Sequence, residues 1–221
     1  NISNIEEFKK TLKYDAYYVV QGSPNFYNGN IRIIRNDPSY KYWGVTHEYI
    51  ELPDNTVIEN ISKSVLFIND IGDGVNKENK FQRDIDLLLK GLELHPNNPR
   101  YLFYLANSYR DSNQYERAIE IYNKRIEVGG WLQETWYSCY SIANCYMYMK
   151  QFDKALFYWL EAYQVMPTRI ENLYMIVSYY RTKNQYALAL MFYEIANKIR
   201  IENPPINHLF LENDIYEHKL D

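Results

Sequence analysis

The chain repeats one pattern three times between residues 83 and 201, and this repeat limits its fold more than any other feature. In each unit an alanine is followed four residues later by an aromatic residue and preceded nine residues earlier by a tyrosine. The aligned residues are Ala118, Tyr122 and Tyr109; Ala155, Trp159 and Tyr146; and Ala189, Tyr193 and Tyr180. The alanines lie 37 and 34 residues apart. A period of this length predicts structural units that stack on one another.

Within each unit, the apolar residues have helical spacing. Three residues apart stand Leu102 and Leu105, and the next two units have an apolar pair at the same positions. A polar stretch at 113–116, 150–153 and 184–187 then marks the same turn each time. We therefore expect two antiparallel helices per unit, with a half-unit over 81–95 before them. Cys139 stands at a core position of this pattern and is interpreted as a core residue rather than a reactive thiolate.

The residues that carry this pattern resemble the tetratricopeptide repeat, a 34-residue pair of helices with a small residue where the helices cross. Pro96 and Pro167 match the proline that closes its second helix, whereas Gly130 and Ile201 depart from it. At the small position of the first helix stand Ala106, Ala143 and Val177. The resemblance implies a mainly α fold, a tetratricopeptide-like α-α superhelix, over residues 81–203.

The repeat register also predicts which first-helix residues face the concave groove of such a superhelix. The three rows are Phe103, Tyr140 and Tyr174; Asn107, Asn144 and Ser178; and Arg110, Met147 and Arg181. One interpretation is a groove that holds an extended peptide or stacks against sugar rings. The other is that the aromatic row packs on a segment of the same chain, such as its C-terminal end. The family's clamp for C-terminal carboxylates needs a basic residue where Phe103 stands, so that ligand is not expected.

Residues 1–69 read differently and predict a small α/β element. Residues 4–13 have helical spacing, and β-branched and aromatic runs at 15–21, 30–35, 57–58 and 65–68 are typical of strands. We expect a linker over 70–80, where the sequence is polar and contains glycine. Residues 204–221 follow a Pro-Pro pair and are expected to cap the superhelix or to be a truncated continuation of it.

The order of motifs in the first part resembles the second half of a family-2 glycosyltransferase catalytic domain of the GT-A type. An Arg-x-x-Arg strand at 32–35 is followed by an aromatic-Gly-x-x-His-Glu segment at 43–48. The resemblance implies transfer of a sugar from a nucleotide-sugar donor to a hydroxyl of a glycan or protein acceptor. It implies Mg²⁺ or Mn²⁺ in the complete enzyme, because a divalent cation stabilises a diphosphate leaving group.

The same resemblance assigns roles to six residues. His47 is the candidate metal ligand, and Glu48 is the candidate catalytic carboxylate, which orients His47 or binds the acceptor. The candidates for acceptor or phosphate binding are Arg32, Arg35, Tyr42 and Trp43. Each has a plainer interpretation: a hydrogen-bonded surface His-Glu pair, a core tryptophan and two solvated arginines.

The chain departs from that family because it has no Asp-x-Asp metal motif after a buried strand and lacks the nucleotide-binding strands. Asp84-Ile-Asp86 matches the letters but begins a predicted repeat helix. We therefore expect a fragment of a transferase, inactive alone and holding no cofactor by itself. Two alternatives remain: a non-catalytic tetratricopeptide module for protein interaction, and a scaffold whose repeats mediate assembly.

Composition excludes several other classes. With 24 Lys+Arg against 28 Asp+Glu, the chain lacks the basic excess of a nucleic-acid binder. No apolar run approaches the roughly 20 residues that span a bilayer. Two cysteines favour a reducing compartment, so the expected localisation is cytoplasmic. The abundance of Asn, Ile, Lys and Tyr is typical of AT-rich genomes such as those of large DNA viruses, in which case the compartment is the host cytoplasm.

Overall fold

The computed structural model describes the chain except residues 1–4, 23–26, 70–78 and 204–209. The chain divides into two compact units, Asn1–Lys77 and Glu78–Asp221. Most of the predicted linker over 70–80 lies outside the described residues, and so does the Pro204-Pro205 break. The fold class is the expected one: mainly helical, with a tetratricopeptide-like superhelix after a small α/β element.

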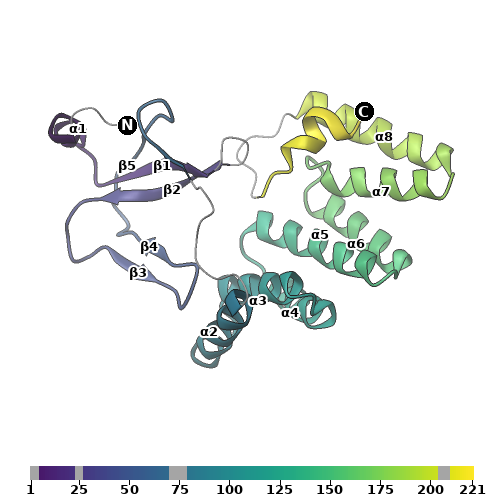
Figure 1. The fold of residues 1–221 in the computed structure, drawn as a ribbon, viewed down its shortest axis with the longest axis horizontal. Helices are drawn as coiled ribbons and strands as arrows, with labels where there is room; N and C mark the ends of the chain where they lie inside the picture. Colours follow the sequence, from purple (N-terminus) through teal and green to yellow (C-terminus); the bar gives the residue numbers. More distant parts are fainter. Residues whose placement is uncertain (1–4, 23–26, 70–78, 204–209) are drawn as a thin grey trace. The chain divides into compact units, whose positions relative to one another are not determined.

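The first unit contains a short helix and a four-stranded sheet (Figure 1). The elements are α1 (Ile5–Thr11), β1 (Ala16–Gly22), β2 (Tyr27–Ile34), β5 (Ile58–Asn60) and β6 (Phe67–Asn69). Strand β1 pairs antiparallel with β2 and parallel with β5 and β6. Along β1 burial alternates, because Tyr17 and Val19 enter a small core with Ile61 while Tyr18 is exposed. This alternation is the pattern of a strand with one covered face.

A separate two-stranded sheet joins β3 (Lys41–Trp43) and β4 (Tyr49–Glu51). These two strands were not predicted from the sequence, because each has only three residues and is defined by pairing with the other. Between them, Gly44 has a φ of 118° and His47 has a left-handed φ of 50°. A Cβ on Gly44 would lie 3.2 Å from the Thr46 carbonyl oxygen, so this turn requires glycine.

The second unit is a succession of helices, each packed on the next (Figure 1). They are α2 (Lys80–Leu94), α3 (Pro99–Asp111), α4 (Tyr115–Val128), α5 (Leu132–Tyr148), α6 (Phe152–Val165), α7 (Glu171–Thr182) and α8 (Tyr186–Glu202). The small residues predicted at the crossings are buried: Ala106, Ala143, Val177, Ala118, Ala155 and Ala189. Small side chains at these positions let the helix axes approach closely.

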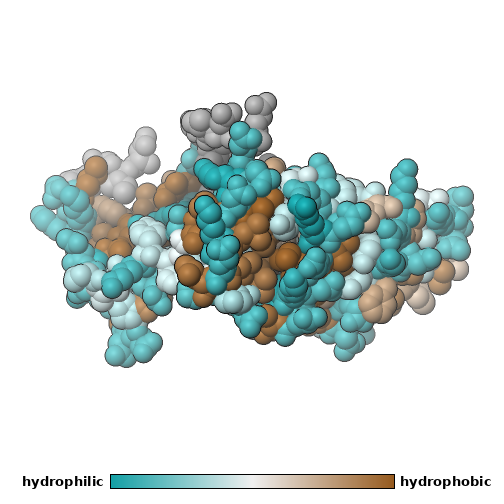
Figure 2. Space-filling view, turned by 90° about the horizontal axis from the view of Figure 1, so that it is seen from below, coloured by the Kyte–Doolittle hydropathy of each residue, from teal (hydrophilic) through white to brown (hydrophobic). Residues whose placement is uncertain are grey.

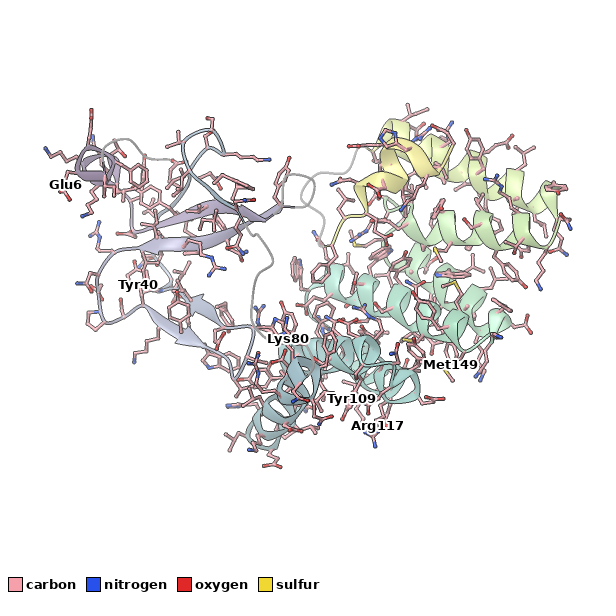
Figure 3. The ribbon with its side chains drawn as sticks, viewed as in Figure 1. Glu6, Tyr40, Lys80, Tyr109, Arg117 and Met149 are labelled. Carbon is pink, nitrogen blue, oxygen red and sulfur yellow. The ribbon has the colours of Figure 1, made fainter. Side chains whose placement is uncertain are left out.

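The turn inside each helix pair has the same geometry three times. Asn113, Lys150 and Asn184 all have a φ near 60°. In each turn the backbone amide of the next residue, a glutamine, donates to the carbonyl of the aligned tyrosine of the repeat. The distance is 2.8 Å in the first turn and 2.9 Å in the other two. In the first pair, the Arg117 guanidinium of α4 lies 5.8 Å from the ring centroid of Tyr109 of α3 (Figure 3). The three polar stretches of the sequence are therefore equivalent turns.

Helix lengths follow the residue at the closing position. Helices α2, α4 and α6 all end two residues before this position, which Pro96, Gly130 and Pro167 occupy, and Gly130 has a φ of 103°. At the end of the third pair, Ile201 replaces the proline. Helix α8 therefore continues through it and has 17 residues, against 14 in α4 and α6.

The C-terminal segment, residues 210–221, contains the π-helical turn η2 (Ile215–Lys219) and lies beside α7 and α8 (Figure 1). Ile215, Tyr216 and Leu220 belong to the same hydrophobic cluster as Ile170 and Ile199. This packing joins the segment to the core of the second unit.

No helix in the described parts of the chain is long and apolar enough to cross a membrane. The face drawn in Figure 2 shows hydrophobic residues interspersed with hydrophilic ones. Exposed aromatic residues of the helical unit include Tyr148 and Phe157, at 59% and 56%.

Candidate functional site

The two predicted groove asparagines pair the helices of their own repeat. The Tyr122 hydroxyl donates to Asn107 Oδ1 at 2.6 Å, and Trp159 Nε1 donates to Asn144 Oδ1 at 3.2 Å. Each donor lies 15 residues after its acceptor, so the contact recurs with the repeat. Both aromatic residues stand at aligned positions of the repeat, but their contact with the asparagines was not predicted from the sequence. The amide oxygen of each asparagine therefore has a structural role.

The predicted aromatic row is covered at two of its three positions. Phe103 is 1% exposed and its ring stacks on that of Phe210, with centroids 6.2 Å apart and planes 10° apart. Tyr140 is 5% exposed, and its hydroxyl donates to Glu212 Oε1 at 2.8 Å. Burial, followed by the negative charge of Glu212, raises the pKa of Tyr140. The C-terminal segment is thus the neighbour of this row, as in the second of the two interpretations.

An open pocket of about 480 Å³ lies next to the covered part of the groove. Six of its lining residues are Arg110, Asp111, Tyr137, Tyr140, Asn144 and Glu212. They come from α3, α5 and the C-terminal segment, and three of them are predicted groove residues. We call this hollow the Arg110 pocket.

Arg110 is held in place at the edge of the pocket by both charged and neutral partners. Its Nε donates to Asp111 Oδ1 at 2.8 Å, and its Nη1 donates to the Tyr137 hydroxyl at 3.2 Å and to Ser141 Oγ at 3.1 Å. A guanidinium fixed in this way presents a constant direction for hydrogen bonding. Aromatic rings and polar groups around it form a surface suited to peptide-like ligands.

The remaining wall of the pocket carries a stacked pair of tyrosines. The rings of Tyr115 and Tyr148 lie 5.4 Å apart with planes at 20°, and the Tyr115 hydroxyl donates to Asn113 Oδ1 at 2.7 Å. These residues lie at the turn end of the groove and were missed by the sequence analysis. The sequence does contain an aromatic residue beside each repeat turn, but this residue was used only to mark the turn and not as a candidate for binding.

The third-repeat residues of the predicted rows do not line the Arg110 pocket. Tyr174 and Ser178 are half-buried on α7, and Arg181 is exposed near its C-terminal end. The Arg110 pocket therefore brings together predicted groove residues of the first two repeats and none of the third.

A buried polar network anchors the C-terminal segment at the start of α7. Arg169 forms an ion pair with Glu171 and lies 3.5 Å from the ring centroid of Trp136. The Tyr216 hydroxyl donates to Glu171 Oε2 at 2.9 Å and accepts from the Ile170 amide at 3.3 Å. Burial and the charge of Glu171 raise the pKa of Tyr216. No local sequence pattern predicts this network, since Tyr216 and Glu171 are 45 residues apart.

In the first unit, the two candidate arginines pair with β1. Arg32 Nε donates to Gln21 Oε1 at 2.6 Å, and Arg35 Nη2 lies 3.0 Å from Asp15 Oδ1. Both are exposed residues of the four-stranded sheet or of its edge. One pair joins β2 to β1, and the other joins the residue after β2 to the residue before β1.

The other four candidates belong to the β3–β4 hairpin. Tyr42 is 67% exposed, whereas Trp43 is half-buried with its ring 5.7 Å from that of Tyr49. His47 and Glu48 close the turn, the first half-buried and the second exposed. The structure thus divides the six candidates between two sheets. Their roles in sugar transfer stay predictions.

Among the described residues, no group of three or more His, Cys, Asp or Glu side chains is placed to hold a metal ion. The Mg²⁺ or Mn²⁺ of a complete transferase accordingly stays a prediction from resemblance. Both cysteines are buried free thiols, and burial raises the pKa of each to about 12. This agrees with the interpretation of Cys139 as a core residue.

The comparisons with known proteins point to the helical unit. A family model described as anaphase-promoting complex, cyclosome, subunit 3 matches residues 85–162, from α2 into α6. The second unit is a tetratricopeptide-like repeat array. No curated protein matches the chain. These findings give no support to the glycosyltransferase resemblance of residues 1–69.

Solved structures of MamA are similar to part of the chain. MamA from residue 41 to its end, from Desulfovibrio magneticus RS-1, has 15% identity, with 57% of this chain and 69% of that chain covered and a TM-score of 0.48. A crystal structure of MamA protein has 21% identity, with 60% and 70% covered and a TM-score of 0.49.

Proposed function

We propose that the helical unit is a protein-interaction module that binds a segment of a partner protein in the groove formed by its first helices. The observation that carries the proposal is the Arg110 pocket, whose wall combines Arg110, Tyr140 and Asn144 from successive repeats. A groove built from equivalent positions of stacked repeats suits an extended ligand, because each repeat offers the next stretch of the ligand a similar set of contacts.

The chemistry of the pocket supports a peptide as the ligand. Tyrosine hydroxyls, amides and a fixed guanidinium offer hydrogen bonds to peptide groups, and the ring faces of Tyr115 and Tyr148 offer apolar contact. Tyrosine and arginine are enriched among the residues that carry binding energy at interfaces. The net charge of −4 makes a nucleic acid a poor alternative ligand.

The glycosyltransferase prediction for residues 1–69 and the cytoplasmic localisation are not part of this proposal. Nothing observed in the four-stranded sheet or the β3–β4 hairpin favours nucleotide-sugar binding over a structural role for the six candidate residues. Nucleotide-sugar hydrolysis with Mn²⁺, measured on a longer protein that includes the nucleotide-binding half and on its His47→Ala variant, is the direct test of that prediction.

The proposal is tested with a phage-displayed library of random peptides selected on the full chain and on its Phe210→Ala, Glu212→Gln variant, because Phe210 and Glu212 contact the groove residues Phe103 and Tyr140. We expect enriched peptides to lose at least about tenfold in affinity for a Tyr148→Ala chain, because an aromatic ring at a binding hot spot contributes 2 kcal/mol or more. Phe157→Ala is the matched control: Phe157 is equally exposed and packs on Tyr158 with centroids 5.2 Å apart, but lies on α6 outside the pocket. Equal binding to the two variants, or no enrichment at all, would contradict the proposal.

A further inference from the structure

The C-terminal segment occupies the groove in the manner of a bound peptide. It contacts the first helix of two repeats and the start of the third: Phe210 meets α3 and α5, Glu212 meets α5, and Tyr216 meets the N-terminal end of α7. Its path crosses Phe103 and Tyr140, two members of the row that the repeat register assigns to the groove. The segment therefore covers the surface on which a ligand is expected.

Apolar anchors of the segment alternate with exposed residues, as in a docked peptide. Ile215, Tyr216 and Leu220 are 1%, 8% and 2% exposed, whereas residues 217–219 between them are exposed. The ring of Phe210 lies 4.7 Å from that of Tyr137. Docked peptides commonly use this arrangement, with a few side chains in pockets and the rest in solvent.

Two carboxylates of the segment meet defined donors of the helical unit. Glu212 accepts from the Tyr140 hydroxyl and lines the Arg110 pocket. Asp221 accepts from Arg200 Nη2 at 2.8 Å and from Arg200 Nη1 at 3.1 Å. The hydrogen bonds from Arg200 hold the pKa of Asp221 below its ordinary value. The helical unit therefore offers the segment an apolar place at Phe103 and a carboxylate place at Tyr140, both in the groove. Beyond them it offers a further apolar pocket and a second carboxylate place at Arg200 of α8, outside the first helices.

We infer that residues 210–221 are an internal ligand of this groove and that the partner segment has the same chemistry: an aromatic residue, a carboxylate two positions later, and an aliphatic-tyrosine pair after it. The inference rests on the proposed function and names its ligand class. Partner and C-terminal segment bind one surface and exclude each other. A segment tethered to its binding site has an effective concentration of the order of millimolar. A free peptide therefore competes poorly until the contacts of residues 210–221 are weakened.

The test uses a fluorescent peptide with the sequence of residues 210–221 and measures its anisotropy with the full chain. The opened chain carries Phe210→Ala and Glu212→Gln, which remove two contacts of the segment outside the buried cluster. We expect the opened chain to bind the peptide at least about tenfold more tightly than the original chain. A peptide with the same two substitutions should bind the opened chain at least about tenfold more weakly than the original peptide does.

Further variants guard against a loss of folding. Glu212→Gln alone alters an exposed residue, and we expect it to strengthen peptide binding severalfold, since bonds to a charged group are the stronger ones. Lys219→Ala, at an exposed residue of the same segment, should leave binding unchanged. Far-ultraviolet circular dichroism checks that each variant keeps its helices.

Two results would overturn the inference: a folded opened chain and a Glu212→Gln chain that both bind the peptide no better than the original chain, or equal binding of the original and substituted peptides. Such a result leaves the proposed function standing when library peptides still bind at Tyr148. Loss of library binding together with tight binding of the 210–221 peptide would instead limit the groove to its internal ligand. The two failures are therefore distinguishable.

Discussion

At the scale of the residue, backbone geometry is repeated more faithfully than residue type. The three repeat turns need one left-handed residue each, which asparagine supplies at 113 and 184 and lysine at 150. Asparagine adopts this conformation more readily than lysine, because its short polar side chain bonds to the local backbone. The lysine turn is therefore the least favourable of three otherwise equivalent turns.

We expect Lys150→Asn to raise the free energy of unfolding by about 0.5–1 kcal/mol, a typical gain when a residue suits a left-handed position better. The reverse change in the sister turn, Asn184→Lys, should lower it by a similar amount. Urea denaturation followed by circular dichroism measures both. If both variants shift stability in the same direction, the left-handed conformation is not what limits these turns.

A second residue-scale feature is the buried ion pair between Arg125 and Glu134. Arg125 is fully buried, its Nη2 lies 2.8 Å from Glu134 Oε2, and its Nη1 donates to the Gly129 carbonyl at 2.6 Å. The pair thus holds the three-residue insertion 129–131 between the first and second full repeats. The 37-residue spacing of Ala118 and Ala155, against 34 in the next repeat, indicates three additional residues here but does not show which side chains hold them.

Replacing Arg125 with Met should lower the free energy of unfolding by about 3–5 kcal/mol, because Glu134 is left as an uncompensated buried charge. Lys124→Ala, which breaks the neighbouring exposed pair with Glu120, should cost less than about 1 kcal/mol. Denaturant melts of the two variants give the comparison. A loss below about 1 kcal/mol for Arg125→Met would show that the insertion is held by its backbone alone.

At the scale of the element, the helix crossings determine how the repeats pack. Ala155 is fully buried where α6 crosses α5, and its equivalents in α4 and α8 are buried too. Trp159, one turn later, is 1% exposed and fills the space beside the crossing. The alanine therefore lets the two helices approach closely, and the aromatic residue four positions later fills the space beside the crossing.

Ala155→Leu should lower the free energy of unfolding by about 1–3 kcal/mol, the usual cost of adding methylene groups to a filled site. Gln164→Leu, on an exposed position of the same helix, is the control and should change stability by about 0.5 kcal/mol or less. Thermal melts followed at the helical circular dichroism band measure both. If Ala155→Leu left the free energy of unfolding unchanged, α5 and α6 would have room to separate.

At the scale of the whole molecule, buried tyrosines make the stability of the helical unit depend on pH in the alkaline range. Burial is the main cause that raises the pKa of five tyrosines in this unit. They are Tyr104, Tyr122, Tyr140, Tyr158 and Tyr216. In the unfolded chain these phenols ionise at about pH 10. Above that pH the unfolded state binds fewer protons than the folded state, so stability falls as pH rises.

We therefore expect stability to begin to fall near pH 9, where the two buried thiols ionise in the unfolded chain, and to decrease more steeply beyond about pH 10, with the C-terminal segment sharing this loss through Tyr216. Denaturation at about pH 8 and about pH 11 measures the change, and the near-ultraviolet absorbance of tyrosinate reports ionisation. In Tyr216→Phe the decrease should be shallower. Equal slopes in the two proteins would mean that Tyr216 titrates normally in the folded chain.

The fold was largely predictable because its signals are local. Residues 4–13 predicted the helix found at Ile5–Thr11, and the runs at 15–21 and 30–35 correspond to β1 and β2. The repeat alignment predicted the helix pairs from α3 to α8. The β3–β4 hairpin was missed, since its short strands are defined by pairing with each other rather than by any pattern of their own.

The candidate site was predictable only as a set of positions. Repeat register identifies which first-helix residues share a row, because helical period and repeat length fix the face of each residue. It does not say what covers that face. Tyr140 and Glu212 are 72 residues apart, and no spacing rule connects them.

The sequence by itself determined the stacked helix pairs and their turns, since alanine, aromatic and turn residues at fixed intervals can be buried only by pairing and stacking. Only the tertiary structure decided that residues 210–221 cover Phe103 and Tyr140, that asparagine amides join helices of one repeat, and that Arg125 and Arg169 are buried with carboxylates. The physical reason is that local period sets which face a residue takes, whereas the partner on that face depends on how distant segments pack together.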